Sequence, residues 1–361
     1  MKATRTLHDL GQSLWLDNIT RTMLDEGTIK GYVDDLDVTG LTSNPSIFKK
    51  AIVDSDAYDE AIRESRADSA EDLFFELAID DLRRAADLFA DVHKASGGID
   101  GWVSLEVSPL LADDAEATKR AATELHKRAR RDNLFIKIPG TRAGCDAIEA
   151  SIFSGVPVNV TLLFSRDQTL AAAEAWMRGI ERRIEAGLDP HVTSVLSLFV
   201  SRWDVAVADK VPPELKDRLG IAVAGDTYAA YLELCRSARW QKLAGQGIKP
   251  QRLLWASTST KDPDARDTLY VEALAAPDTI NTLPDKTLKA FADHGKLAGP
   301  MATDGVEARR TLATFRDAGI DLDALAAQLQ REGAASFSDS WHALLADLGK
   351  ERQRLGHGAG A

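Results

Sequence analysis

The chain has 361 residues, of which 44% are hydrophobic and 28% charged, and its formal net charge is −12. This charge argues against nucleic-acid binding, because contact with a phosphate backbone needs a basic face. No stretch approaches the roughly 20 uninterrupted apolar residues of a membrane span, and the polar N-terminus lacks the apolar centre of a signal peptide, so we expect a cytosolic globular protein.

Short β-like runs alternate with amphipathic helical segments along most of the chain. The expected strands are residues 13–17, 38–42, 102–108, 134–139, 156–164, 193–200, 252–256 and 279–283. The clearest helical segments between them are residues 73–92, 115–131, 167–186 and 226–244. This alternation predicts parallel βαβ units, and eight of them predict an α/β fold of the closed (β/α)8 TIM-barrel type. An open, doubly wound sheet is the alternative, although no GxGxxG fingerprint follows an early strand.

Two spacers are longer than a plain barrel unit requires, at residues 45–100 and 201–250, and both predict extra helices. After the last strand we expect helices at about 286–294, 304–318 and 322–349, which form an extension that folds back over the barrel. Residues 356–361 resemble a frayed tail. No repeat or low-complexity linker divides the chain, so we expect a single domain over residues 1–361.

A lysine lies in the middle of an apolar strand, Lys137 in Asn133-Leu-Phe-Ile-Lys-Ile-Pro-Gly140. Burial disfavours the charged form of an amine, which would leave Lys137 as a nucleophile able to form a Schiff base with a carbonyl substrate. The alternative is a lysine at the strand end whose ammonium group reaches solvent.

Glu106 lies in Val103-Ser-Leu-Glu-Val-Ser108, where it alternates with two serines. Successive strand residues point to opposite faces, so Glu106 is expected on a polar interior face, away from Val103, Leu105 and Val107.

Active sites of (β/α)8 barrels lie at the C-terminal ends of the strands, so the polar residues there are the candidates. Besides Glu106 and Lys137, they are Asp17, Thr42, Asn44, Asn159, Thr161, Ser197, Arg202, Ser257, Ser259 and Lys261. Structural explanations remain open for three of them. Asp17 could cap the next helix, Asn44-Pro45 could begin one, and Ser257 could bind a loop amide.

The sequence predicts no metal site and no disulfide framework. The seven histidines show neither HxH nor HExxH spacing. Cys145 and Cys235 have no CxxC spacing, so we expect both to be inert packing residues in a reducing compartment.

Motifs along nearly the whole chain resemble those of the transaldolases, which belong to the class I Schiff-base aldolase superfamily. The matching stretches are Leu41-Thr-Ser-Asn-Pro-Ser-Ile-Phe48, Val103-Ser-Leu-Glu-Val-Ser108, Leu134-Phe-Ile-Lys-Ile-Pro139, Val158-Asn-Val-Thr-Leu-Leu-Phe-Ser165 and Ser197-Leu-Phe-Val-Ser-Arg202. Trp255-Ala-Ser-Thr-Ser-Thr-Lys261 and Asn281-Thr-Leu-Pro284 resemble the longer bacterial branch of that family.

The resemblance implies a catalytic role for four residues and no cofactor. Lys137 would form the Schiff base with a ketose phosphate, and Asp17 would take the C4 hydroxyl proton during cleavage. Glu106 would transfer protons through a water held by Thr161.

The resemblance also implies a set of substrate-binding residues. Asn44, Asn159 and Ser197 would bind the dihydroxyacetone unit, and Arg202 would bind the phosphate. Thr42 is expected among the substrate-binding residues as well. After strand seven the family commonly has a Ser-x-Arg pair, whereas this chain has Ser257 without the arginine. Lys261 is the cation expected to replace it.

The expected function is transfer of a dihydroxyacetone unit from sedoheptulose 7-phosphate to glyceraldehyde 3-phosphate, in the pentose phosphate pathway. One alternative is a fructose 6-phosphate aldolase of the same fold, although Glu106 favours a transferase. The other is a barrel that binds sugar phosphates without catalysis, which would have no use for an amine buried beside a carboxylate.

Overall fold

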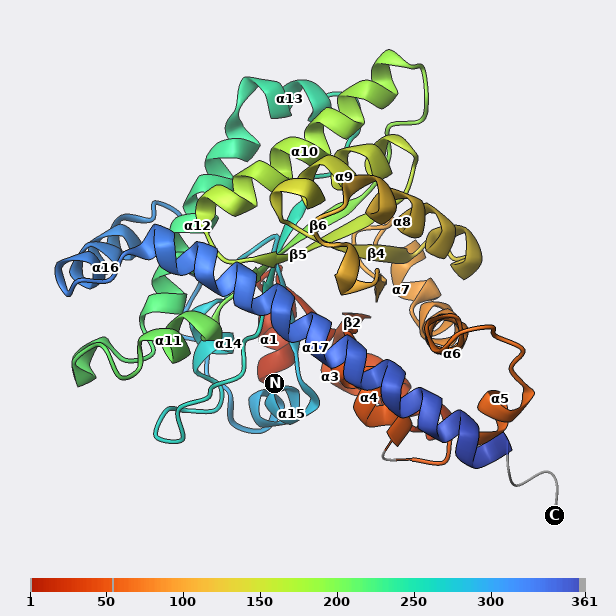
Figure 1. Ribbon diagram of the computed structural model, residues 1–361. Coiled ribbons are helices and arrows are strands. Elements are labelled where there is room, and N and C mark those ends of the chain that lie inside the picture. Colours follow the sequence, from red (N-terminus) through yellow and green to blue (C-terminus); the bar gives the residue numbers. More distant parts are fainter. Residues whose placement is uncertain (1, 54, 357–361) are drawn as a thin grey trace.

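The structure, a computed structural model, describes residues 2–53 and 55–356. Its centre is a closed barrel of parallel strands in sequential order, with helices around it (Figure 1). The last strand, β8, pairs with the first, β1. The strands are β1 (Ser13–Leu16), β2 (Val38–Leu41), β3 (Val103–Glu106), β4 (Leu134–Pro139), β5 (Val158–Leu163), β6 (Ser194–Phe199), β7 (Arg252–Ala256) and β8 (Ile280–Leu283). The predicted (β/α)8 barrel is therefore confirmed. The open doubly wound sheet is wrong, because an open sheet would leave β1 or β8 without this pairing.

Helices surround the barrel. Up to β6 they are α1 (Ala3–Asp9), α2 (Arg21–Asp25), α3 (Thr28–Leu36), α4 (Pro45–Val53), α5 (Asp59–Glu64), α6 (Ala70–Leu88), α7 (Ala90–Ala95), α8 (Ala115–Ala129), α9 (Arg142–Phe153) and α10 (Arg166–Glu185). After β6 come α11 (Ser201–Val207), α12 (Leu219–Arg236), α13 (Ala238–Ala244), α14 (Leu269–Ala273), α15 (Asp285–His294), α16 (Val306–Asp317) and α17 (Leu322–Gly356). Short 3₁₀ turns span Pro109–Leu111 and Pro213–Leu215. Within the described residues, no helix combines the length and the apolar character needed to cross a membrane.

Two of the expected helices are each divided in the structure. The segment expected at 226–244 is α12 followed by α13, because Ser237 adopts an extended conformation. Its hydroxyl accepts a hydrogen bond from the amide of Trp240 and so begins a new helix. The segment expected at 73–92 is divided between α6 and α7 at Phe89, whose φ and ψ are −90° and 0°. Amphipathic periodicity continued across both breaks and did not reveal them.

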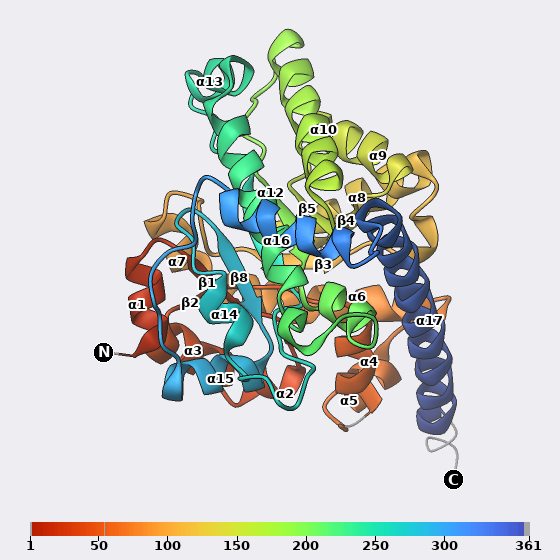
Figure 2. The same ribbon diagram turned by 90° about the vertical axis from the view of Figure 1, so that its left-hand side faces the viewer.

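The C-terminal extension lies where the sequence indicated, and its last helix crosses one end of the barrel (Figures 1 and 2). Helix α17 has 35 residues and contacts α4, α5, α6 and β5. It continues to Gly356, so the prediction that the frayed tail begins at this residue is wrong. The rest of the predicted tail, residues 357–361, lies outside the described residues.

An aromatic stack fills the barrel interior below the strand ends. The rings of Trp102 and Phe135 are stacked with centroids 4.0 Å apart, and Trp15 is stacked on the other side of Phe135 at 6.3 Å. Gly40 on the neighbouring strand makes room for this packing, because a Cβ there would lie 2.6 Å from the Trp15 ring. The interior is therefore closed at its base, and the polar strand ends lie at the opposite end.

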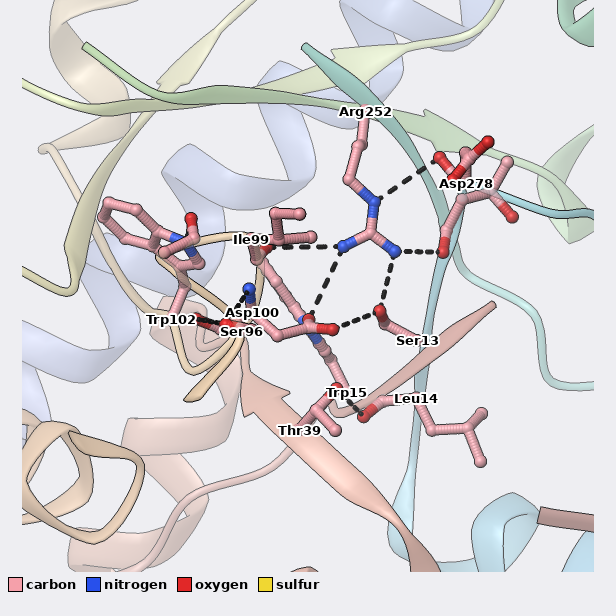
Figure 3. Close-up of polar contacts among 12 residues, drawn as sticks. Ser13, Leu14, Trp15, Thr39, Ser96, Ile99, Asp100, Trp102, Arg252 and Asp278 are labelled. Atoms are coloured by element: carbon pink, nitrogen blue, oxygen red, sulfur yellow. Dashed lines mark hydrogen bonds and ion pairs between the residues drawn. The ribbon is translucent and has the colours of Figure 1, made fainter. Parts of the chain in front are cut away.

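A buried polar network joins the N-terminal ends of the strands (Figure 3). The carboxylate of Asp100 accepts hydrogen bonds from the Ser13 hydroxyl at 2.5 Å and from the Trp15 indole at 2.9 Å. The guanidinium of Arg252 lies 3.6 Å from the same carboxylate and donates to Ser13 and to the carbonyl of Thr279, at 2.6 and 2.7 Å. The network connects β1, β7 and the segments that lead into β3 and β8.

We expect Asp100→Ala to lower the free energy of unfolding by about 3–5 kcal/mol, because it leaves a buried guanidinium, hydroxyl and indole without their acceptor. Asp34→Ala is the control, since its partner Lys30 is on the surface and such pairs contribute about 0–1 kcal/mol. Urea unfolding of both variants measures the difference. Equal losses in the two variants would contradict the structural role of the network.

Candidate active site

Strands β3 and β4 place Lys137 beside Glu106 inside the barrel. The two residues are register partners, and Lys137 Nζ lies 3.3 Å from Glu106 Oε2 and 3.3 Å from the carbonyl oxygen of Ser43. Lys137 is 6% exposed and Glu106 4%. The lysine side chain therefore does not reach solvent, and the structure excludes the surface-lysine interpretation. A lysine amine held at this position can attack a carbonyl carbon and form a covalent intermediate.

The environment of Glu106 suits proton transfer. Burial raises the pKa of this carboxyl, and the nearby positive charge of Lys137 opposes the increase. Its second oxygen, Oε1, has no hydrogen-bond partner among the described residues, and the same holds for the buried hydroxyl of Thr161 on β5. Both atoms are available to bind a substrate group or a water.

Asp17 follows β1 and is held by Thr42, which follows β2. The Thr42 hydroxyl lies 3.2 Å from Asp17 Oδ1 and 2.7 Å from the hydroxyl of Thr282 on β8. Burial raises the pKa of Asp17, whereas the charge of Lys137 and the Thr42 hydrogen bond lower it. The suggestion that Asp17 caps the next helix is wrong, because Thr20 caps α2. The Asp17 carboxylate therefore belongs to the strand-end cluster.

A chain of side-chain hydrogen bonds crosses the interior from β6 to β3. The hydroxyl of Ser197 donates to Asn159 Oδ1 at 2.7 Å, and Asn159 Nδ2 donates to the hydroxyl of Ser104 at 3.1 Å. Asn159 is also the register partner of Lys137. These bonds fix the orientation of the Asn159 amide beside the amine.

Asn44 has the structural role that the sequence left open. Its Oδ1 accepts a hydrogen bond of 3.1 Å from the amide of Ile47, at the beginning of α4. Asn44 nevertheless lines a cavity of about 460 Å³ together with Asp17, so the residue borders the strand-end cluster.

Arg202 is the second residue of α11, immediately after β6. Its guanidinium carbon lies 5.1 Å from the Phe199 ring centroid and 5.9 Å from that of Phe337. Burial lowers the pKa of Arg202, and within residues 2–53 and 55–356 no carboxylate lies in ion-pair range of it. A half-buried guanidinium beside two aromatic rings is suited to bind an anionic group of a substrate.

The loop after β7 places Ser257 near Arg202, and Lys261 lies further along the same loop. Ser257 has a positive φ of 55° and its carbonyl accepts from the amide of Ser201, one residue before Arg202. Lys261 is exposed, donates to the hydroxyl of Ser259 at 2.9 Å, and lines a separate cavity with Asp204. Its charge nevertheless lowers the pKa of Asp17, which places it on the same side of the barrel.

Two further residues lie at this site and were not among the candidates predicted from the sequence. Phe337 of α17 places its ring centroid 5.8 Å from Lys137 Nζ. Thr282 of β8 is buried, and its hydroxyl lies 2.7 Å from that of Thr42, the residue that holds Asp17. Thr282 could have been found as an inward-pointing polar residue of the last strand. Phe337 could not, because a phenylalanine in an amphipathic helix is typical of a packing residue.

The fold and the site together define a class of protein. A (β/α)8 barrel whose strand ends bring together a buried lysine, two carboxylates and an arginine is typical of an enzyme that forms a Schiff base with a phosphorylated carbonyl substrate. The chain belongs to the Transaldolase/Fructose-6-phosphate aldolase family, whose pattern matches residues 14–348.

Curated relatives cover nearly the whole chain. A protein of Frankia alni is 43% identical over 357 residues, which are 96% of this chain and 96% of the relative. A protein of Thiobacillus denitrificans is 43% identical over 97% of this chain and 100% of its own length. A third relative, from Neisseria gonorrhoeae, is 42% identical over 94% of this chain and 97% of its own length. Each of the three is named transaldolase.

Proposed function

We propose that this chain is a cytosolic transaldolase of the pentose phosphate pathway, which transfers a dihydroxyacetone unit from sedoheptulose 7-phosphate to glyceraldehyde 3-phosphate. The products are erythrose 4-phosphate and fructose 6-phosphate. The observation that carries the proposal is the Lys137 amine, buried 3.3 Å from Glu106 at the centre of the barrel. We expect the reaction to need neither a metal nor an organic cofactor.

The first half of the reaction depends on Lys137 and Glu106. The amine attacks the ketone carbon of the donor and gives a carbinolamine, which loses water and becomes an iminium ion. Glu106 accepts and returns the protons of these steps, through a water bound between its free oxygen and the Thr161 hydroxyl. The raised pKa of Glu106 supports this role, since the carboxyl then exchanges protons nearer to neutral pH.

The second half depends on Asp17. This carboxylate removes the proton of the C4 hydroxyl, the C3–C4 bond breaks, and the iminium accepts the electron pair to give an enamine. The aldose leaves, and the acceptor aldehyde is attacked by the enamine while Asp17 returns the proton. Thr42 supports the role because it fixes one oxygen of Asp17.

Polar groups around the amine would bind the dihydroxyacetone unit. Asn159 and Ser197 are fixed by mutual hydrogen bonds, so their remaining donors and acceptors are preorganised. For Asn44 we propose that the amide nitrogen takes part, because its oxygen is engaged by the backbone of α4.

Conversion of fructose 6-phosphate tests the proposal, with and without erythrose 4-phosphate as acceptor. A transaldolase gives sedoheptulose 7-phosphate when the acceptor is present and little free dihydroxyacetone in its absence. Equal release of dihydroxyacetone under both conditions would identify an aldolase instead. If fructose 6-phosphate is not converted under either condition, the protein would be a barrel that binds sugar phosphates without catalysis.

For the phosphate we propose Arg202 as the main ligand, with Ser257 and Lys261 as further ligands. Arg202→Ala is expected to raise KM for fructose 6-phosphate by roughly 10- to 100-fold, because charge-assisted hydrogen bonds are lost. Lys261→Ala is expected to have a smaller effect, since this side chain is an exposed point charge.

Steady-state kinetics with unphosphorylated fructose provide the control for both variants. A merely structural effect of Arg202→Ala would raise KM for fructose equally, and would contradict the phosphate assignment. An unchanged KM for fructose 6-phosphate in Lys261→Ala would remove Lys261 from the site and leave Ser257 with backbone amides.

A further inference from the structure

Helix α17 is attached to the strand ends that carry the candidate catalytic residues. The side-chain nitrogen of Gln330 donates to the carbonyls of Gly140 and Leu162, at 3.0 Å each. Gly140 follows β4, the strand of Lys137, and Leu162 lies at the end of β5, one residue after Thr161. The helix is thus fixed over the mouth of the barrel rather than merely packed beside it (Figures 1 and 2).

One helical turn further on, a glycine lets α17 approach the mouth closely. A Cβ at Gly333 would lie 3.0 Å from Leu162 Cδ2 and 3.1 Å from Arg202 Nη1. A Cβ at this position would crowd both side chains, which would have to shift away from the helix. This close approach brings the next turn of the helix down to the buried amine.

Phe337 occupies that turn and contacts both cations of the site. Its ring centroid lies 5.8 Å from Lys137 Nζ and 5.9 Å from Arg202 Cζ, and the side chain is 6% exposed. Both distances are within the range of cation–π attraction. A single ring therefore lies within cation–π range of both the proposed nucleophile and the proposed phosphate ligand.

We propose that Phe337 is a positioning residue, which sets the relative placement of Lys137 and Arg202 and shields the covalent intermediate from water. This inference rests on the proposed function. A transferase must keep its enamine until the aldehyde arrives. Protonation of the enamine at C3 regenerates the iminium. Water then attacks C2, the carbon bonded to nitrogen, and the resulting carbinolamine releases dihydroxyacetone and restores the free amine. The hydrophobic ring beside Lys137 Nζ limits access of water to the carbon that the nitrogen binds.

The variants for the test are Phe337→Ala and Phe337→Leu, with Trp341→Phe as the matched control. Trp341 is one turn further along α17 and packs against Phe74 and Phe75, with ring centroids 4.9 and 5.6 Å away. The control therefore disturbs the packing of the same helix without reaching the site.

The measurement is the ratio of released dihydroxyacetone to transferred dihydroxyacetone, with fructose 6-phosphate as donor and erythrose 4-phosphate as acceptor. Phe337→Ala is expected to raise this ratio by roughly 10-fold and to lower kcat for transfer, because water reaches the intermediate. Phe337→Leu is expected to retain the shield and to fall between wild type and Phe337→Ala. A ratio in Phe337→Ala equal to that of Trp341→Phe overturns the inference.

A second readout separates this inference from the proposed function. Borohydride trapping of dihydroxyacetone on Lys137 needs only the positioned amine and no transfer. If the wild-type protein traps dihydroxyacetone but transfers none to an aldose, the proposed transaldolase function is overturned. In that case a slower trapping rate in Phe337→Ala than in wild type would still support the positioning role of Phe337. If Phe337→Ala does not fold, Phe337→Leu provides the test instead. A trapping rate and a ratio of released to transferred dihydroxyacetone that both equal the wild-type values would overturn the inference.

Discussion

Lys137→Met is expected to reduce turnover of fructose 6-phosphate on the order of 10⁶-fold, because no other residue of the cluster offers a nucleophilic amine for the covalent pathway. The fold should survive. Methionine keeps the length of the apolar stem, and Glu106, whose pKa burial already raises, can take up a proton once its cationic partner is lost. Circular dichroism and urea unfolding test the fold, and a coupled aldose assay tests turnover.

The covalent adduct gives an independent check of the same assignment. Borohydride added together with fructose 6-phosphate should leave a reduced dihydroxyacetone mass on the peptide that contains Lys137. The Lys137→Met variant is the control and should carry no such mass. A label on Lys261, or on any other lysine, would contradict the assignment.

Asp17→Asn is expected to slow C3–C4 cleavage by about 10²–10⁴-fold, with little effect on imine formation. An amide keeps the shape of the carboxylate and its bond with Thr42 but cannot accept the C4 proton. Because burial raises the pKa of Asp17, wild-type cleavage should also decline on acidification at a higher pH than an ordinary aspartate would give. Single-turnover experiments that follow the aldose separately from the imine provide the measurement.

Glu106→Gln is the comparison variant for Asp17→Asn. It should slow imine formation and hydrolysis, with a smaller effect on cleavage once the imine exists. If both variants retained wild-type rates in both phases, the two carboxylates would have no acid–base role. A reversed pattern would exchange their roles.

The barrel and the central pair of the site could be predicted because both follow from local patterns. Alternation along Val103-Ser-Leu-Glu-Val-Ser108 placed Glu106 inside the barrel, and the structure has Ser104 of the same run bonded to Asn159. An apolar run with one amine identified Lys137. These inferences need only the period of a strand and the polarity of its residues.

Other features depend on contacts that no local pattern encodes. The helix break at Ser237 could not be predicted without the tertiary packing that favours two helices over one. The side-chain oxygen of Asn44 could equally have bound a substrate or capped a helix, and the sequence does not distinguish the two. Phe337 reaches the site only because Gln330 and Gly333 set the path of α17. Single-sequence reasoning has no access to such pairings between distant segments.

The order in which the chain is synthesised has a consequence for this architecture. Strand β1 emerges from the ribosome first, but the hydrogen-bonding edge it shares with β8 cannot be satisfied until Ile280–Leu283 has been made. Until then the nascent sheet has open edges, which favour pairing with other chains. Helix α17 is made after β8, so the amine of Lys137 acquires its aromatic neighbour Phe337 only after the last barrel strand has been made. A chain released before β8 has been made would therefore be an incomplete barrel with exposed strand edges. Such a chain would tend to aggregate and would not be merely a less active enzyme.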